Sequence, residues 1–104
     1  MTTWKYLWLY WECDFIDVFT AEEFEFGWFK QVFPKARIEE YHADGPPLNA
    51  FRCYRIDKLS NYASFPVMAI IEHLGSVGWE AFAAAFSGGF YNQRGTIWFK
   101  RVEL

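Results

Sequence analysis

Cysteine, histidine and long apolar runs are all scarce in this chain of 104 residues. Its only cysteines, Cys13 and Cys53, lie far apart in the sequence, which argues against a disulfide framework and against a clustered metal site. No uninterrupted apolar run approaches about 18 residues, so we expect no membrane-spanning segment. No basic, apolar leader opens the chain, so we expect no secretory signal, a cytoplasmic location and reduced thiols.

Positive charge is also in short supply. The formal net charge is −3, which argues against a global basic field for nucleic acid. Residues 1–50 contain nine acidic and four basic side chains, whereas residues 51–104 contain six basic and four acidic ones. This asymmetry either steers self-association between opposite faces or simply solvates two sides of the protein.

Aromatic side chains, in contrast, are abundant. Twelve Phe, six Tyr and six Trp make up 23% of the chain. A body of this size has difficulty burying so many large rings completely. We therefore expect apolar surface to remain exposed, and surface of this kind usually marks an interaction site.

Residues 4–11 alternate in a way that predicts a strand. One face of this segment collects Trp4, Tyr6, Trp8 and Tyr10, and the other collects Leu7, Leu9 and Trp11. Two apolar faces indicate a central or doubly covered strand. Further along, the sequence FRCYRID over 51–57 predicts another strand.

The stretch over residues 15–44 supports two interpretations. The sequence Thr20-Ala21-Glu22-Glu23 resembles a capping box and favours a helix. Phenylalanines that alternate with acidic residues after position 22 favour a strand instead, and we expect a strand over 23–33. A turn at Pro34-Lys35, extended chain over 37–42 and a loop at 44–47 should follow.

The second half of the chain is more regular. Ser64 as N-cap, Pro66 in the first turn and an apolar stripe at spacings of three and four predict a helix over 65–77. Strands at 79–86 and 96–102, separated by a turn-rich segment, predict a hairpin. The expected fold is α+β: an antiparallel sheet of about four to five strands, with one main helix packed on one face.

The alanine-rich segment 79–86 allows a finer expectation. Regular alternation would place Ala81, Ala83 and Ala85 on one face, together with Trp79. Such a row of small side chains would form a shallow groove, and we expect the helix over 65–77 to pack into it. The alternative is that the alanines continue the helix, as their propensity favours.

Three segments carry a family resemblance: WKYLWL at the start, LGSVGWE at 74–80 and WFKR at 98–101. In these the chain resembles the domain-of-unknown-function 4177 family, small bacterial and phage domains with an aromatic first strand, a helix ending in Gly-Trp-Glu and a closing Phe-Lys-Arg strand. The resemblance covers 4–10 and 64–102. Relative to the family, residues at about 11–63 are an insertion, and the resemblance implies a fold but no activity. The length of the chain predicts a single domain over 1–104.

The shared motif has a physical interpretation of its own. We expect Gly75 and Gly78 to let the chain leave the helix, and Trp79 to anchor the turn that follows. We expect Glu80 to form an ion pair with Lys100 or Arg101 on the neighbouring strand. The residues assigned to this structural motif are Gly75, Gly78, Trp79, Glu80, Phe99, Lys100 and Arg101.

Residues that could carry chemistry lack a supporting pattern. Cys13 with His42 or His73 could form a nucleophile and base, but no signature surrounds the cysteine. Neither C-x-x-C nor H-x-x-x-H spacing occurs, so we expect no metal and no cofactor. Arginines interleaved with aromatics, as in Phe51-Arg52, could stack single-stranded bases, but the acidic net charge argues against nucleic acid.

Together these observations favour a non-enzymatic protein-interaction module that self-associates. The alternative is a small-ligand or nucleotide-binding protein with an aromatic pocket. A homo-oligomer is the expected assembly, and a protein partner is the other expected ligand; no catalytic residue is assigned. The expected interaction surface consists of Trp4, Trp8, Trp11, Tyr91 and Arg94.

Overall fold

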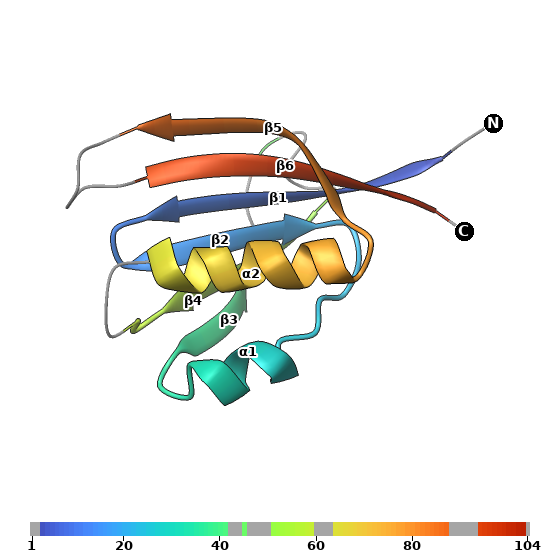
Figure 1. The fold of residues 1–104 in the computed structure, drawn as a ribbon. Helices are drawn as coiled ribbons and strands as arrows, with labels where there is room; N and C mark the ends of the chain where they lie inside the picture. The colour runs from blue at the N-terminus through green and yellow to red at the C-terminus, as the bar shows by residue number, and fades with distance from the viewer. Residues whose placement is uncertain (1–2, 42–44, 46–50, 60–63, 88–93, 104) are drawn as a thin grey trace.

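The computed structural model describes residues 3–41, 45, 51–59, 64–87 and 94–103. Its elements in chain order are β1 (Trp4–Glu12), β2 (Phe15–Thr20), α1 (Gly27–Val32), β3 (Arg37–Tyr41), β4 (Arg52–Asp57), α2 (Ser64–Ser76), β5 (Glu80–Ser87) and β6 (Arg94–Val102). The strands form one sheet in the order β3-β4-β2-β1-β6-β5, and every neighbouring pair is antiparallel (Figure 1). The two ends of the chain lie side by side, since the Glu103 N–H donates to the Thr3 carbonyl over 2.9 Å.

An antiparallel sheet with helices on one side confirms the expected class, but the expected number of strands was too small. The sheet has six strands, and a second helix accompanies α2. The missed strand is β2, which follows β1 through a turn at residues 13–14 that pairs Glu12 with Phe15. The two turn residues are Cys13 and Asp14, so this turn lacks the Asn-Gly or Asp-Gly pair that usually marks a two-residue hairpin. No helix in the described part of the chain is long and apolar enough to cross a bilayer.

The expectation of a strand over 23–33 was wrong. Residues 27–32 form the helix α1. This helix does not begin at the segment that resembles a capping box, because Thr20 is the last residue of β2 and is buried there. Gly27 opens α1 instead of interrupting it, so the usual cost of an interior glycine does not apply. Phe29 and Phe33 lie four residues apart with ring centroids 4.8 Å from each other, which gives this short segment a helical apolar side.

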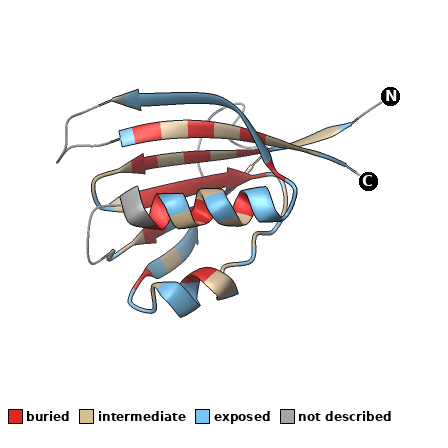
Figure 2. Ribbon diagram, viewed as in Figure 1, coloured by how far each residue is buried: buried red, intermediate tan, exposed pale blue. Residues whose placement is uncertain are grey.

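The core lies between the helices and one face of the sheet, here called the helix-covered face. Alternate residues of β1 and β6 point into it, as the burial colours along these two strands show, whereas β2 is buried on both faces (Figure 2). Its main contributors are Leu7, Leu9, Ile16, Val18, Ile97 and Phe99 from the strands, Phe29 from α1, and Val67, Ile70 and Leu74 from α2. The predicted apolar stripe of α2 is therefore confirmed.

The end of α2 corrects the expected role of one glycine. Gly75 is a helical residue with open space around it, so neither positive φ nor close approach requires a glycine there. Gly78 has φ of +96° and makes the turn, and the Trp79 N–H then donates to the Leu74 carbonyl over 2.9 Å. A left-handed glycine directly after a helix satisfies carbonyls that the helix leaves unpaired.

The alanine segment forms β5 and pairs with β6, which confirms the hairpin. A β-bulge between Ala81 and Ala83 breaks the expected alternation. Ala83 and Ala85 consequently pair with Trp98 and Thr96, away from the helix-covered face. The expectation that α2 packs on the alanines was also wrong: residues 81–86 are all exposed, because β5 is the edge strand and α2 lies over the middle of the sheet (Figures 1 and 2).

The two glycines predict opposite mutational effects. Gly75→Ala should stabilise the protein by about 0.5–1 kcal/mol, because alanine reduces backbone entropy in a helix and the space is open. Gly78→Ala should destabilise it by about 1–2 kcal/mol, because a Cβ is disfavoured at positive φ. Urea unfolding of the two variants beside the parent measures both free energies, and shifts of the same sign would contradict the assignment.

Candidate functional site

The face of the sheet opposite the helices, here called the open face, carries a row of stacked rings. Phe19 of β2, Trp8 of β1 and Trp98 of β6 lie on neighbouring strands. The ring centroids of Trp8 and Phe19 are 4.3 Å apart with planes inclined by 22°, and those of Trp8 and Trp98 are 5.0 Å apart with planes inclined by 5°. Both faces of the Trp8 indole are therefore covered. We call these three residues the aromatic stack.

Hydrogen bonds fix the orientation of this stack. The Trp8 indole N–H donates to the hydroxyl oxygen of Thr96, and that hydroxyl donates to the Leu9 carbonyl over 2.9 Å. Since Thr96 is bound to the backbone of the neighbouring strand, it holds the middle ring of the stack in one position. Ala83 of β5 is the residue opposite Trp98, so the row of rings ends at a methyl group.

An ion pair between a buried carboxylate and an exposed guanidinium lies on the other half of the open face. Asp17, which is 3% exposed, accepts two hydrogen bonds from Arg55, at 2.8 and 2.9 Å. The guanidinium also lies 4.3 Å from the Phe15 ring centroid. Burial, followed by the charge of Asp17, raises the pKa of Tyr41 to about 12. A buried carboxylate with a two-pronged partner is fully paired, so this cluster is best explained as structural.

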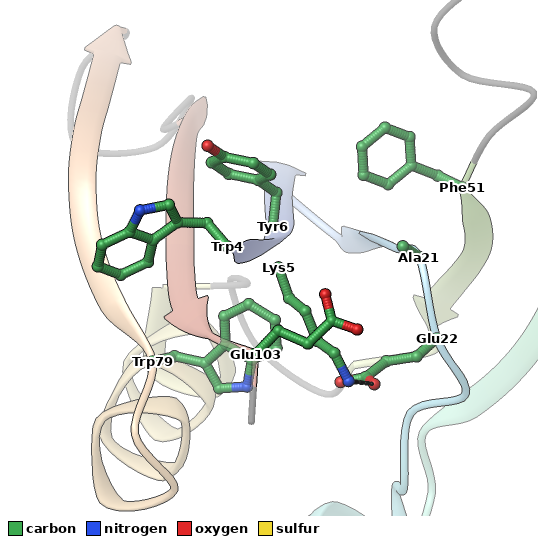
Figure 3. Close-up of a pocket in the computed structure, with 8 residues that line it drawn as sticks. All are labelled: Trp4, Lys5, Tyr6, Ala21, Glu22, Phe51, Trp79 and Glu103. Carbon is green, nitrogen blue, oxygen red and sulfur yellow. Dashed lines mark hydrogen bonds and ion pairs between the residues drawn. The ribbon is translucent and has the colours of Figure 1, made fainter. Parts of the chain in front are cut away.

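A pocket of about 390 Å³ lies near the two ends of the chain, where β1 begins (Figure 3). It is lined by Trp4, Lys5, Tyr6, Ala21, Glu22, Phe51, Trp79 and Glu103. Glu22 accepts a hydrogen bond from Lys5 at 2.8 Å and another from Arg101 at 2.7 Å. Two of the charged groups at this pocket are thus bound to each other, which lowers the pocket's capacity to bind a charged ligand.

Residues of the structural motif predicted from sequence lie together beside this pocket. Trp79 is buried, and the Arg101 guanidinium carbon lies 4.6 Å from its ring centroid. Phe99 lies in the core, whereas Lys100 points to the open face, with its ammonium 4.5 Å from the Trp4 ring centroid. Glu80 lies opposite Lys100 as expected, but the two form no ion pair within 4.0 Å in the described structure.

The residues expected to form an interaction surface do not share one face. Trp4 and Trp8 lie half-buried on the open face. Trp11 is 5% exposed and belongs to the core, because period-two alternation in β1 turns it toward the helices. Arg94 is exposed at the start of β6, and Tyr91 lies outside the described residues. Sequence analysis missed Trp98 and Phe19, since only the strand register brings them beside Trp8.

Among the described residues, Cys13 and His73, which the sequence suggested as a nucleophile and a base, do not contact each other. Cys13 lies in the turn between β1 and β2, Cys53 is buried in β4, and His42 lies outside the described residues. His73 of α2 stacks on Trp28 of α1, with centroids 3.9 Å apart. Within the ranges that the structure describes, no group of three His, Cys, Asp or Glu residues is placed to hold a metal ion.

The two edges of the sheet differ sharply. At one edge, β3 has five residues, and Arg37, Glu39 and Glu40 are charged and exposed. At the other edge, β5 has eight residues and carries no charge between positions 81 and 86. Phe82 and Phe86 on β5 are 48% and 68% exposed. Edge strands are usually protected by charge, proline or short length, and β5 has only its bulge and the charge of Glu80 at its first position.

Comparisons of the chain with known protein families and with curated protein sequences found no match.

The burial of Trp79 predicts a large mutational effect. Trp79→Ala should cost about 3–5 kcal/mol, because it removes a buried indole and the surface on which Arg101 lies. Val77→Ala, at an exposed position two residues earlier, is the control and should change stability by less than about 0.5 kcal/mol. Thermal and urea unfolding measure both, with Trp79→Leu as the milder variant if the alanine variant does not fold.

Stacking of His73 on Trp28 predicts a pH dependence of stability. Burial lowers the pKa of His73 below its ordinary value of about 6.5, so the unfolded chain binds the proton more tightly. The free energy of unfolding should therefore be highest above about pH 6.5, where His73 is neutral in both states. It should decrease as the pH falls below that value toward the pKa of His73 in the folded protein. Urea midpoints at pH 7.5 and 5.5 test this, and His73→Phe should reduce the difference between them.

Proposed function

We propose that this protein is a non-enzymatic interaction module that self-associates by pairing the edge strand β5 with β5 of a second copy. The exposed β5 edge, which carries no charge between positions 81 and 86, is the observation that supports the proposal. Among the described residues β5 pairs with β6 alone, so its outer backbone groups have no strand partner there. An edge of this kind is a template for strand addition.

The nature of the strand favours a second copy as the partner. A two-fold interface places the same segment of both chains together, and strands related in this way run antiparallel. Because residues 81–86 are alanine and phenylalanine only, self-pairing brings no like charges together. At the other edge, β3 has three exposed charged side chains, and charges of this kind protect a strand edge from pairing. The contrast supports pairing through β5 and not through β3.

Two exposed rings add apolar area to this edge. Phe82 lies on the open face against Tyr6, with centroids 5.9 Å apart, and Phe86 lies on the helix-covered side against Trp11, with centroids 5.7 Å apart. A second copy paired along β5 would cover part of both rings. Aromatic burial on both faces of a joined sheet would add to the backbone hydrogen bonds.

Two further assignments belong to this proposal. We propose a cytoplasmic location and a distant relationship to the domain-of-unknown-function 4177 family. The relationship is supported by the arrangement of the shared motif, in which Trp79 and Arg101 meet next to the turn at Gly78. Neither assignment adds an activity.

A lysine on β5 should abolish self-association. We expect the parent to be a dimer or larger at about 100 µM, a concentration at which micromolar association is observable. Ala84→Lys should be monomeric at that concentration, because a charge protects a strand edge from pairing. Sedimentation velocity and light scattering measure the mass.

Glu40→Gln is the matched control, since it changes the net charge by the same amount at the β3 edge. It should leave the mass of the parent unchanged. A parent that stays monomeric at about 100 µM, or loss of association in both variants, would overturn the assignment to β5.

A further inference from the structure

The aromatic stack ends in an uncovered ring. Trp8 covers one side of the Trp98 indole, and Phe51 meets Trp98 only edge-on, with centroids 6.5 Å apart and planes inclined by 77°. Among the described residues no ring stacks on the remaining side of Trp98. The strand on that side contributes Ala83, and Ala83 is exposed. The methyl group of Ala83 therefore occupies the position at which a larger side chain would continue the row.

The spacing of the row suits one more planar ring at that position. The two centroid separations in the stack, 4.3 and 5.0 Å, bracket the separation of neighbouring strands, which is about 4.8 Å. A flat ring placed above Ala83 would continue the same repeat and stack on Trp98. Ala85, the next residue of β5 on the open face, is also exposed and leaves room along the strand.

Basic side chains lie on both sides of this position. Lys100 and Arg94 belong to the same face of β6 as Trp98, two and four residues away. Neither forms an ion pair within 4.0 Å among the described residues. The Trp98 indole N–H has no hydrogen-bond acceptor in that part of the chain either. The position thus offers an aromatic surface, a hydrogen-bond donor and two basic side chains without an ion pair in the described ranges, although Lys100 already lies over the Trp4 ring.

We infer that this position, above Ala83 and beside Trp98, binds a planar aromatic anion of mononucleotide size. The ring stacks on the indole, and the anionic group is attracted by Lys100 or Arg94. A single nucleotide fits better than a nucleic-acid strand, because only one ring face is open and the protein carries a net charge of −3. The site lies on the sheet face, so it does not depend on pairing of the β5 edge.

Titration with AMP tests the inference. AMP should shift the Trp98 indole N–H resonance in a saturable manner, with a Kd of about 1 mM or tighter. Ala83→Phe should weaken binding by about tenfold or more, because its own ring fills the open position. Ala84→Phe is the matched control, since Ala84 is exposed on the opposite face of the same strand, and it should bind AMP like the parent.

Further probes separate the parts of the proposal. Adenosine and ribose 5-phosphate should each bind more weakly than AMP, and a single-stranded dA oligonucleotide should bind no more than about tenfold tighter per site. No saturable shift up to about 10 mM AMP, or equal binding by Ala83→Phe, would overturn the site. Tighter oligonucleotide binding would overturn the assignment to a mononucleotide. The sedimentation mass of Ala83→Phe is measured in parallel. A loss of AMP binding with an unchanged mass then shows an effect on the ring position and not on self-association.

Discussion

Packing of the two helices against one face of a single sheet is the constraint on which the rest of the structure depends. The sheet has six strands, so its width is about 24 Å at the usual strand separation. The longer helix has 13 residues and a length of about 20 Å, and the shorter has only six. Helices of this size can cover the middle of one face. The helices therefore cover neither the open face nor the strand β5, and these parts are stabilised by other contacts or remain exposed.

The open face solves this problem with aromatic side chains. Phe19, Trp8 and Trp98 cover one another, and each stacked pair contributes about 0.5–1.5 kcal/mol beyond its buried area. Asp17 and Arg55 close the remaining part with a paired charge. Much of the aromatic excess in the composition is thus explained within one chain. Among the described aromatic residues, Phe82 and Phe86 on the β5 edge are the most exposed.

Sequence patterns predicted the elements whose periodicity is regular. The alternation in β1 and the stripe of α2 follow from side chains that face a core at every second, third or fourth position. The hairpin of β5 and β6 was predicted from the turn-rich segment between two extended runs. The segment from β2 to α1 has aromatic residues at both spacings, so its local pattern does not decide between strand and helix. The aromatic stack was out of reach for another reason. It depends on the register between β2, β1 and β6, and a sequence pattern does not contain that register.

The β-bulge links the two surfaces on which the proposals rest. In a regular strand without the bulge, Ala83 would lie on the helix-covered face like Ala81, and Phe82 would lie on the open face between them. The extra residue turns Ala83 and Ala85 toward the open face beside Trp98 and Thr96, so small side chains stand at the end of the stack. The same small side chains leave the backbone of β5 accessible along its outer side. The small side chains therefore leave both a ring position and a strand edge open, because alanine at these positions shields neither.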